Sequence, residues 1–480
     1  MLFSSAIFLF LYLPTFLLIY YLLSRRWKNS FLFIASLFFY GWGEGAVVLI
    51  LLLSAFINFM AGKLIEQGQR RTGLWLSLTG SLALLFYFKY TNFMFDTVQS
   101  FAEALQIPAS DALSVARIAL PIGISFYTFQ GISYTLDVYW GRIQANTSFI
   151  NFGTYVAMFP HQIAGPIVRY ADIAPELADR HVTVEKFGLG AERFIIGLSK
   201  KVLLANTFAA IADTLFNAPI NSITTASAWL GIVAYSLQIY FDFSGYSDMA
   251  IGLGKMVGFD FRENFNYPYI ARSIQDFWRR WHISLSNWFR DYVYIPLGGN
   301  RGSKVRTYRN LLIVFFVTGL WHGASWNFIV WGLYHGVFLM IERAGLSRVL
   351  DRIWSPLAHA YTLLVVLVGW VFFRAVDLPS AVAYLQKMTG LLPDQPSAAF
   401  PLSYFTNAEI VVSLLLGIIL STPVYHKFQR SWQRVQSRLV VSTAQRGLEL
   451  MYAVGIFGLF LAAIMYLAAD TYNPFIYFRF

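Results

Sequence analysis

The sequence contains no cysteine and few charged residues. The absence of Cys among 480 residues excludes disulfide bonds, iron–sulfur clusters, zinc sites that use Cys, and a thioester on a cysteine nucleophile. Charged residues make up only 13% of the chain, which is about half the share found in a soluble domain. A soluble enzyme, a secreted disulfide-rich domain and a disordered linker are therefore excluded, and any acyl transfer must proceed without a covalent Cys intermediate.

Hydrophobic residues dominate instead, at 57% of the chain, with 18% aromatic residues. A surface of this composition needs lipid to cover it, so we predict an all-α, polytopic membrane protein. A spanning helix needs ~20 mostly apolar residues, and the runs that qualify predict about ten to twelve transmembrane or re-entrant helices. These runs lie near 5–23, 29–43, 46–62, 74–90, 115–139, 192–216, 227–256, 309–341, 357–373, 408–424 and 448–469.

The excess of basic residues, 36 Lys and Arg against 25 Asp and Glu, indicates membrane topology rather than nucleic-acid binding. It is concentrated in the stretch 262–309, which we expect on the cytoplasmic side. Within this stretch, apolar residues recur at helical steps and predict one amphipathic helix at the membrane surface. These residues are Ile274, Phe277, Trp278, Trp281, Leu285 and Trp288. The same helix is either a surface anchor alone or a docking surface for an anionic cytosolic partner, with Arg279, Arg280 and Arg290 as its basic residues.

Two carboxylates, Asp242 and Asp248, fall inside the long apolar run at 227–256. A charged group there requires a partner, a cavity or a function. One interpretation is helix packing, in which Ser and Gly allow close approach and each Asp pairs with an Arg or a backbone amide. A catalytic role and a proton relay in a transporter are the alternatives.

His322 lies near the middle of an apolar segment without Lys, Arg, Asp or Glu between Arg309 and Glu342. If the segment is one helix, Thr318, Ser325 and Trp326 share the face of His322. A buried neutral imidazole accepts a hydroxyl proton, which suits a general base for an alcohol that attacks an acyl group. A structural histidine is the alternative.

The remaining histidines give weaker signals. His282 follows Trp281 on the amphipathic helix, and His335 is expected on a different helical face from His322. His161 lies in a segment, 159–167, whose Pro and Gly predict a broken or re-entrant element. The sequence has no HxxxH or HExxH spacing, so we expect no metal site.

Several motifs together resemble the membrane-bound O-acyltransferase family, in particular its alginate O-acetyltransferase type. Their order and their spread along the chain make the resemblance specific. The motifs are Met1-Leu-Phe-Ser-Ser-Ala-Ile-Phe-Leu-Phe-Leu11, Ala164-Gly-Pro-Ile-Val-Arg-Tyr170, Tyr240-Phe-Asp-Phe-Ser-Gly-Tyr-Ser-Asp248, Phe277-Trp-Arg-Arg-Trp-His-Ile-Ser-Leu-Ser286, Arg290-Asp-Tyr-Val-Tyr-Ile-Pro-Leu-Gly-Gly-Asn300 and Leu320-Trp-His-Gly323.

The resemblance implies a single membrane domain, residues 1–480, with a helical shell around a central tunnel or funnel. It implies catalytic roles for His322 and His282, and an acyl group, acetyl in this type, taken from a cytosolic thioester. Acetyl-CoA and an acyl carrier protein are both open as donors, and no bound cofactor is expected. Because no stretch has soluble composition, we expect extracytoplasmic acetyltransferase partners of a polysaccharide-modification complex to complete the reaction. The expected location is the bacterial inner membrane.

Attack on a thioester also requires a group that stabilises the oxyanion. Ser325, Trp326 and Asn327 are the candidates, and helical phase favours the first two. We further expect Trp321 and Asp242 to line the substrate tunnel.

Two other functions remain as alternatives. A polysaccharide or ion transporter would depend on Asp242 and Asp248 and on an ion gradient. A scaffold of an export machine would depend on no single polar residue. The terminal aromatic segment 473–480 is either a membrane-interface anchor or a docking strand for an extracytoplasmic partner.

Overall fold

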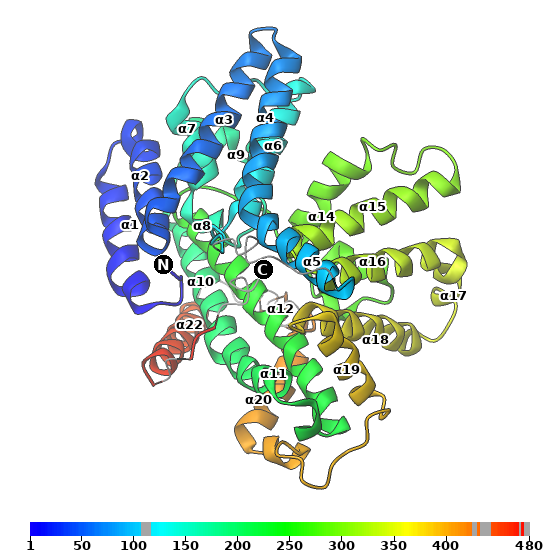
Figure 1. Cartoon of the computed structure of the whole chain (residues 1–480). Coiled ribbons are helices and arrows are strands. Elements are labelled where there is room, and N and C mark those ends of the chain that lie inside the picture. The colour runs from blue at the N-terminus through cyan, green and yellow to red at the C-terminus, as the bar shows by residue number, and fades with distance from the viewer. Residues whose placement is uncertain (107–116, 425–429, 433–442, 470–471, 475–480) are drawn as a thin grey trace.

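The computed structural model is built almost entirely from helices. It describes residues 1–106, 117–424, 430–432, 443–469 and 472–474 (Figure 1). Within these ranges, extended backbone pairs only at an isolated bridge between Ile223 and Phe400. The predicted all-α class is confirmed. Residues 475–480 of the predicted docking strand lie outside the described residues.

The helices of the first half of the chain end with α12, which at 32 residues is the longest helix of the described residues. They are α1 (Leu13–Leu22), α2 (Arg25–Glu44), α3 (Val48–Glu66), α4 (Arg70–Leu85), α5 (Thr91–Ala104), α6 (Ile124–Tyr139), α7 (Phe149–Ala157), α8 (Phe159–Gln162), α9 (Tyr170–Ala178), α10 (Val184–Ser199), α11 (Asn206–Asn217) and α12 (Thr225–Met256). The helices of the second half are α13 (Ile274–Arg280), α14 (Ile283–Phe289), α15 (Lys304–His322), α16 (Trp326–Ile341), α17 (Ser347–Leu350), α18 (Ser355–Arg374), α19 (Leu378–Met388), α20 (Ala408–Leu420) and α22 (Thr443–Ala469).

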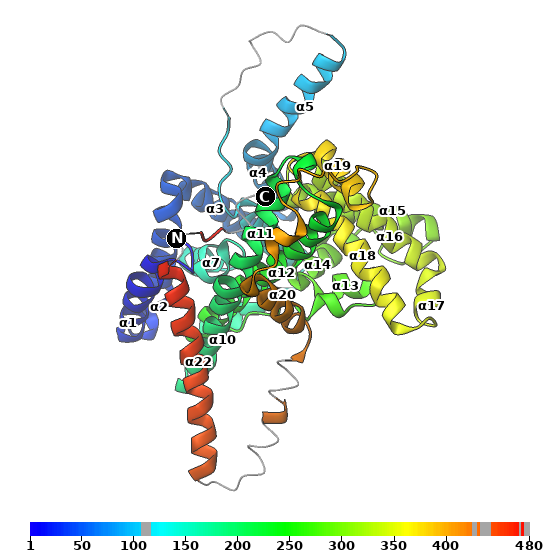
Figure 2. The same ribbon diagram turned by 90° about the horizontal axis from the view of Figure 1, so that it is seen from below.

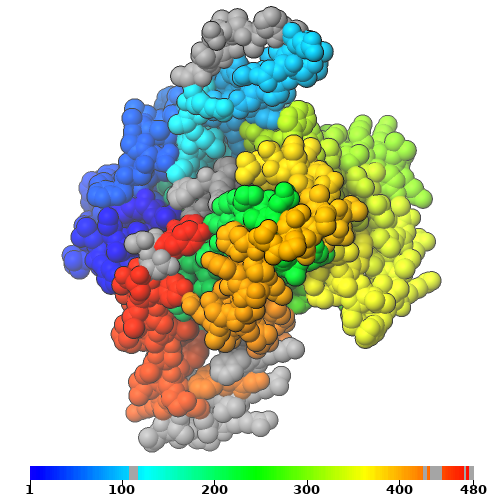
Figure 3. Space-filling view, turned by 60° about the horizontal axis from the view of Figure 1, so that its bottom comes forward, coloured from blue at the N-terminus to red at the C-terminus, as the bar shows by residue number. Residues whose placement is uncertain are grey.

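Helix α12 forms the centre of the molecule, and other helices surround it (Figure 1). Helices α1 to α4 and α6 to α9 lie on one side of it, α13 to α18 lie on the other, and α5 lies beside α16 (Figure 1). Figure 2 shows α5 and α22 projecting in opposite directions from this assembly. In Figure 3 the orange segment that includes α20 lies over the green α12, in agreement with contacts of α12 with α19 and α20.

Glycines bring α10 and α12 into close contact. A Cβ atom built on Gly197 would lie 2.5 Å from the carbonyl oxygen of Gly245, and one on Gly252 would lie 2.5 Å from that of Gly190. Small residues at such contacts let helix backbones approach closely, which is a common device for helix association in membranes. The predicted packing role of the Gly residues in α12 is therefore supported.

The apolar helices make the protein a multi-pass membrane protein. Among the described residues, four helical stretches are long and apolar enough to cross a membrane: Arg25–Glu66, Val184–Asn217, Ser355–Arg374 and Arg446–Ala469. The last of these is only 6% buried by protein, which fits a helix surrounded by lipid. The count of ten to twelve crossings and the central tunnel stay predictions.

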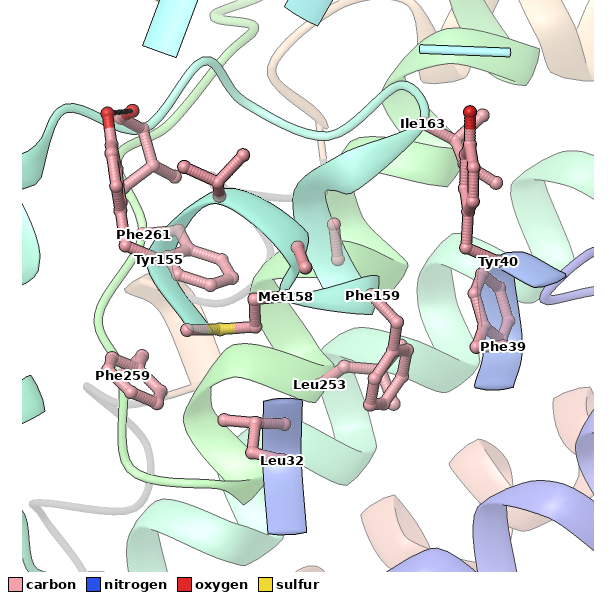
Figure 4. Packing of buried hydrophobic residues seen from close by; sticks show 14 of the residues in the cluster. Leu32, Phe39, Tyr40, Tyr155, Met158, Phe159, Ile163, Leu253, Phe259 and Phe261 are labelled. Atoms are coloured by element: carbon pink, nitrogen blue, oxygen red, sulfur yellow. Dashed lines mark hydrogen bonds between the residues drawn. The ribbon is translucent and has the colours of Figure 1, made fainter. Parts of the chain in front are cut away.

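The segment 159–167 is broken, as its sequence predicts. Helix α8 has one turn, and the chain then continues without helix through Gly165, where a Cβ atom would collide with the backbone of His161. Phe159 is fully buried, and its ring centroid lies 5.0 Å from that of Phe16 and 5.3 Å from that of Phe39. Figure 4 shows Met158 and Phe159 within this apolar cluster, so α8 enters the core of the N-terminal half.

The predicted surface helix in 262–309 is wrong in two respects. The chain forms two short helices, α13 and α14, because His282 adopts a left-handed conformation at φ 43° and interrupts the helix. Its apolar residues are also buried by protein rather than placed at lipid headgroups, since Trp281 is 2% and Leu285 1% exposed. Helical periodicity identifies an apolar face but not what covers it.

Candidate functional site

His322 is the last residue of α15. The helix ends there because Gly323 has an extended conformation, and a Cβ atom at Gly323 would collide with the ring of Phe328. The chain turns back into α16, which packs closely along α15: a Cβ atom built on Gly332 would lie 2.2 Å from the carbonyl oxygen of Phe315. The apolar run 309–341 therefore forms two helices, and the condition under which Ser325 and Trp326 would share the face of His322 is not met. Thr318 and His322 share a face of α15, whereas Ser325 and Trp326 belong to the start of the next helix.

Aromatic rings enclose the imidazole of His322, which is 6% exposed. Its ring centroid lies 4.9 Å from that of Trp321, 4.9 Å from that of Trp331 and 5.1 Å from that of Phe373. These rings come from α15, α16 and α18, so three helices surround the imidazole. Surrounding aromatic rings exclude water, and electrostatic interactions between groups that they enclose are stronger than in water.

His282 is a second histidine that contacts Trp321. Its ring centroid is 6.1 Å from that of Trp321 and 4.7 Å from that of Phe243 on α12. The imidazole is completely buried, and its Nδ1 lies 3.1 Å from Oδ1 of Asn264. The structure therefore brings together three of the predicted site residues, His322, His282 and Trp321.

A buried cation, Lys89, completes this region and was missed by the sequence analysis. It lies in a π-helical turn, Phe86–Tyr90, between α4 and α5. Its ammonium donates to Oγ of Ser125 at 3.0 Å, to the carbonyl of Trp321, and to the carbonyl of His322 at 3.4 Å. The C-terminal carbonyls of a helix carry partial negative charge, so Lys89 stabilises the end of α15. A Lys at the end of the apolar run 74–90 is the signal that indicates this position.

Trp326 and Asn327 make contacts with residues other than His322. Trp326 is 53% exposed and contacts Phe93, with ring centroids 5.7 Å apart. The side-chain amide of Asn327 donates to the carbonyl of Ala375 at 2.8 Å. Ser325 precedes α16, and its hydroxyl makes no capping hydrogen bond, so it is the predicted oxyanion donor that keeps an uncommitted group.

Both carboxylates of α12 form ion pairs. Asp242 lies 2.9 Å from the ammonium of Lys201, with both side chains buried. Asp248 lies 2.6 Å from Arg193 and 2.6 Å from Lys200. Asp248 has the Arg partner that the packing interpretation predicts, whereas the partner of Asp242 is a lysine. Both ion pairs compensate a buried charge, as such charges require.

The basic residues predicted to dock a partner differ in their availability. Arg280 pairs with Asp276 at 2.9 Å, and Arg290 pairs with Asp291 at 2.6 Å. Arg279 is exposed and forms no ion pair with a described residue. Further along, four exposed basic residues have no acidic partner within the described part of the chain. They are Arg301, Lys304, Arg306 and Arg309.

Comparison with known proteins identifies the family. The family model of the membrane-bound O-acyltransferase family matches residues 142–374, which include His282 and His322 but not Lys89. A Pseudomonas putida protein named "Probable alginate O-acetylase AlgI" is 42% identical over 491 residues, covering 100% of both chains. The peptidoglycan O-acetyltransferase of Helicobacter pylori is 37% identical, with 82% of this chain and 80% of that protein covered.

A more distant relative is the teichoic acid D-alanyltransferase of Bacillus subtilis, 31% identical over 45% of this chain and 58% of that protein. The match to the alginate-related protein spans the full length at an identity that leaves no doubt about common ancestry. The helical membrane architecture and the buried histidines agree with this relationship. The chain is therefore a member of the membrane-bound O-acyltransferase family, and it is an O-acyltransferase.

Proposed function

We propose that this protein transfers an acetyl group from a cytosolic thioester to a hydroxyl of an extracytoplasmic polysaccharide, with His322 as the general base. The relatives are named for acylation of alginate, peptidoglycan and teichoic acid, which supports a polymeric acceptor. The transfer is direct or passes through an extracytoplasmic partner protein of a polysaccharide-modification complex. The proposed location is the bacterial inner membrane.

The observation that carries the proposal is the enclosure of His322 by aromatic rings, beside His282 and Trp321. A pocket of this kind keeps water from hydrolysing the thioester and holds the imidazole in its neutral form, in which it can accept a proton. The absence of Cys makes transfer through a cysteine of this chain impossible. Attack by a hydroxyl is the remaining route.

The reaction balances as a single acyl transfer. The hydroxyl oxygen attacks the thioester carbonyl carbon while the imidazole of His322 accepts the hydroxyl proton. The tetrahedral intermediate then collapses, the carbon–sulfur bond breaks, and the imidazolium returns the proton to the leaving thiolate. The products are the O-ester and a free thiol. The Ser325 hydroxyl is the proposed donor to the oxyanion, because Asn327 is committed to Ala375 and Trp326 is exposed.

The thioester donor, acetyl-CoA or an acyl carrier protein, carries negative charge. We assign its docking to the exposed basic residues Arg279, Arg301, Lys304 and Arg306 rather than to Arg280 and Arg290, which acidic neighbours neutralise. Such a surface concentrates an anionic partner before it binds.

The test compares wild-type protein with His322→Ala at matched amounts in the membrane. We expect ester-linked acetate on the extracellular polysaccharide to fall to background, since removal of a general base costs about 10²- to 10⁴-fold. His181→Gln is the matched control, because His181 is exposed and lies far from the pocket, beside Asp179 and Arg25.

Loss of ester in His322→Ala with full ester in His181→Gln supports the proposal. Retained ester in His322→Ala contradicts the role of His322 as the general base. A direct assay tests the same role, because the purified protein in lipid should release thiol from acetyl-CoA or from an acetylated carrier protein only when His322 is present.

A further inference from the structure

The interruption between α13 and α14 is held by a loop segment that runs beside it. The backbone N–H of Ile283 donates to the carbonyl of Asn264 at 2.9 Å, and that of Asn266 donates to the carbonyl of Arg280 at 2.9 Å. These bonds fix the backbone on both sides of His282, which has φ 43° and ψ 56°. In this left-handed conformation the chain leaves the helical path, and the imidazole of His282 is buried.

The side chain of Asn264 is oriented by a donor that cannot act as an acceptor. The backbone N–H of Ser284 donates to this side chain at 3.1 Å, so the atom that faces it is the oxygen, Oδ1. The Ser284 hydroxyl donates to the same oxygen at 2.9 Å. That hydroxyl in turn accepts the backbone N–H of Ile167 at 2.9 Å, which sets its direction.

This orientation decides which nitrogen of His282 carries the proton. Nδ1 lies 3.1 Å from Oδ1 of Asn264, and a carbonyl oxygen can only accept. Nδ1 is therefore protonated, and in the neutral imidazole Nε2 keeps its lone pair. Nε2 is buried and has no hydrogen-bond partner among the described residues.

The surroundings of His282 indicate what that lone pair is for. The ring contacts Phe243 and Trp321, and Trp321 also contacts His322. A buried acceptor without a protein partner costs free energy, so it persists where a bound group satisfies it. In this site, a bound group with an N–H or O–H belongs to one of the two substrates.

We propose that Asn264 is a positioning residue that holds His282 as the Nδ1–H tautomer and so presents Nε2 as a hydrogen-bond acceptor to a donor group of the bound substrate. The inference rests on the proposed function. It assigns a role to a loop residue that acts through His282. It also gives the two histidines different roles. His322 accepts the proton of the attacking hydroxyl, and His282 orients a substrate.

The direct test is nitrogen-15 spectroscopy of the full protein in lipid, with labelled histidine and with His282→Gln to identify the His282 signals. We expect Nδ1 to be protonated and Nε2 unprotonated in the wild type, and a mixture of both tautomers in Asn264→Leu. Protonated Nε2 in the wild type would overturn the proposal, whatever the activity.

The kinetic test compares Asn264→Leu, which removes the acceptor, with Asn264→Asp, which keeps an oxygen at the same place. We expect kcat to fall about tenfold to a hundredfold in Asn264→Leu and to be restored in large part by Asp. Equal losses in the two variants would contradict the proposal.

A double variant distinguishes positioning from a general loss of structure. Adding Asn264→Leu to His282→Gln should cause no further loss of kcat, because the residue acts through His282. An additive loss would refute that connection. Retained acylation in Asn264→Leu together with its loss in His322→Ala would reject this inference and leave the proposed function intact.

Discussion

Two neighbouring residues of α12, Asp242 and Phe243, contact two buried polar regions. The two regions differ in whether the protein itself supplies a partner for the buried polar group. Asp242 meets the ammonium of Lys201, and further along the helix Asp248 meets Arg193 and Lys200. Phe243 contacts the ring of His282, whose Nε2 has no partner in the described part of the chain. In the first region, ion pairs within the protein compensate each charge. In the second region, Nε2 of His282 is an acceptor for a group of the bound substrate.

The difference teaches how to interpret polar residues inside an apolar chain. A paired buried carboxylate contributes to one specific packing of helices, and its removal exposes the charge of its partner. An imidazole held by one nitrogen and open at the other is prepared for a ligand. The sequence shows both kinds of residue next to aromatic and aliphatic neighbours, and only the contacts in the structure distinguish them.

The largest effect should follow from breaking the compensated pair. Lys201→Met leaves the buried carboxylate of Asp242 without its ammonium, and we expect a loss of about 3–5 kcal/mol in the free energy of unfolding. Thermal unfolding in detergent and the fraction of monodisperse protein measure this loss.

The double variant Lys201→Met with Asp242→Leu sharpens the comparison, because it removes both charges. If the pair only supports packing, the double variant should recover most of the stability and should still form polysaccharide ester. A folded double variant without acyltransferase activity would show that Asp242 has a functional role, and the distinction between the two regions would fail.

Much of the fold follows from the sequence because composition and hydropathy require it. The all-helical class and the break at 159–167 were predicted correctly, the latter from Pro160 and Gly165. The turn between α15 and α16 was not, because Gly323, Ala324 and Ser325 hardly change the hydropathy of an apolar run. Hydropathy measures transfer into lipid and does not register a reversal of the chain.

The site was predicted in part for similar reasons. Family motifs indicated His322, His282 and Trp321, and the structure brings them together. Asn264 and Lys89 were not found, because they reach the site through contacts between distant segments. Lys89 donates to a carbonyl 233 positions later in the chain, and no local pattern encodes such a contact.

A smaller effect should follow from Lys89→Met, which removes the ammonium from the end of α15 and from its position 5.9 Å from the ring centroid of Trp321. A hydrogen bond to a charged group contributes about 1.5–3 kcal/mol, and its loss here should displace His322 and lower kcat about tenfold to a hundredfold. The assay is thiol release by the purified protein in lipid, with stability measured in parallel.

Two variants control this prediction. Ser125→Ala removes one acceptor of the same ammonium and should lower kcat less than Lys89→Met. Lys63→Met on α3 removes a lysine that lies over the ring of Phe59, and it should leave kcat unchanged. Normal kcat in Lys89→Met would mean that the end of α15 does not depend on Lys89 and that the cation belongs with the packing charges.

The smallest effect should follow from neutralising the exposed basic residues Arg301, Lys304 and Arg306 together. These three residues have no acidic partner among the described residues. In this respect they are like the unpaired Nε2 of His282 and unlike the ion-paired carboxylates of α12. If they attract an anionic thioester, their replacement by Gln should raise the donor KM a few-fold, leave kcat unchanged and weaken the dependence of the rate on salt.

Replacement of the exposed Arg26 and Arg71 by Gln is the control, since both lie on the expected cytoplasmic side in the N-terminal half. An equal rise in KM in the control would assign the attraction to overall charge, and an unchanged KM in the triple variant would remove this surface from donor binding.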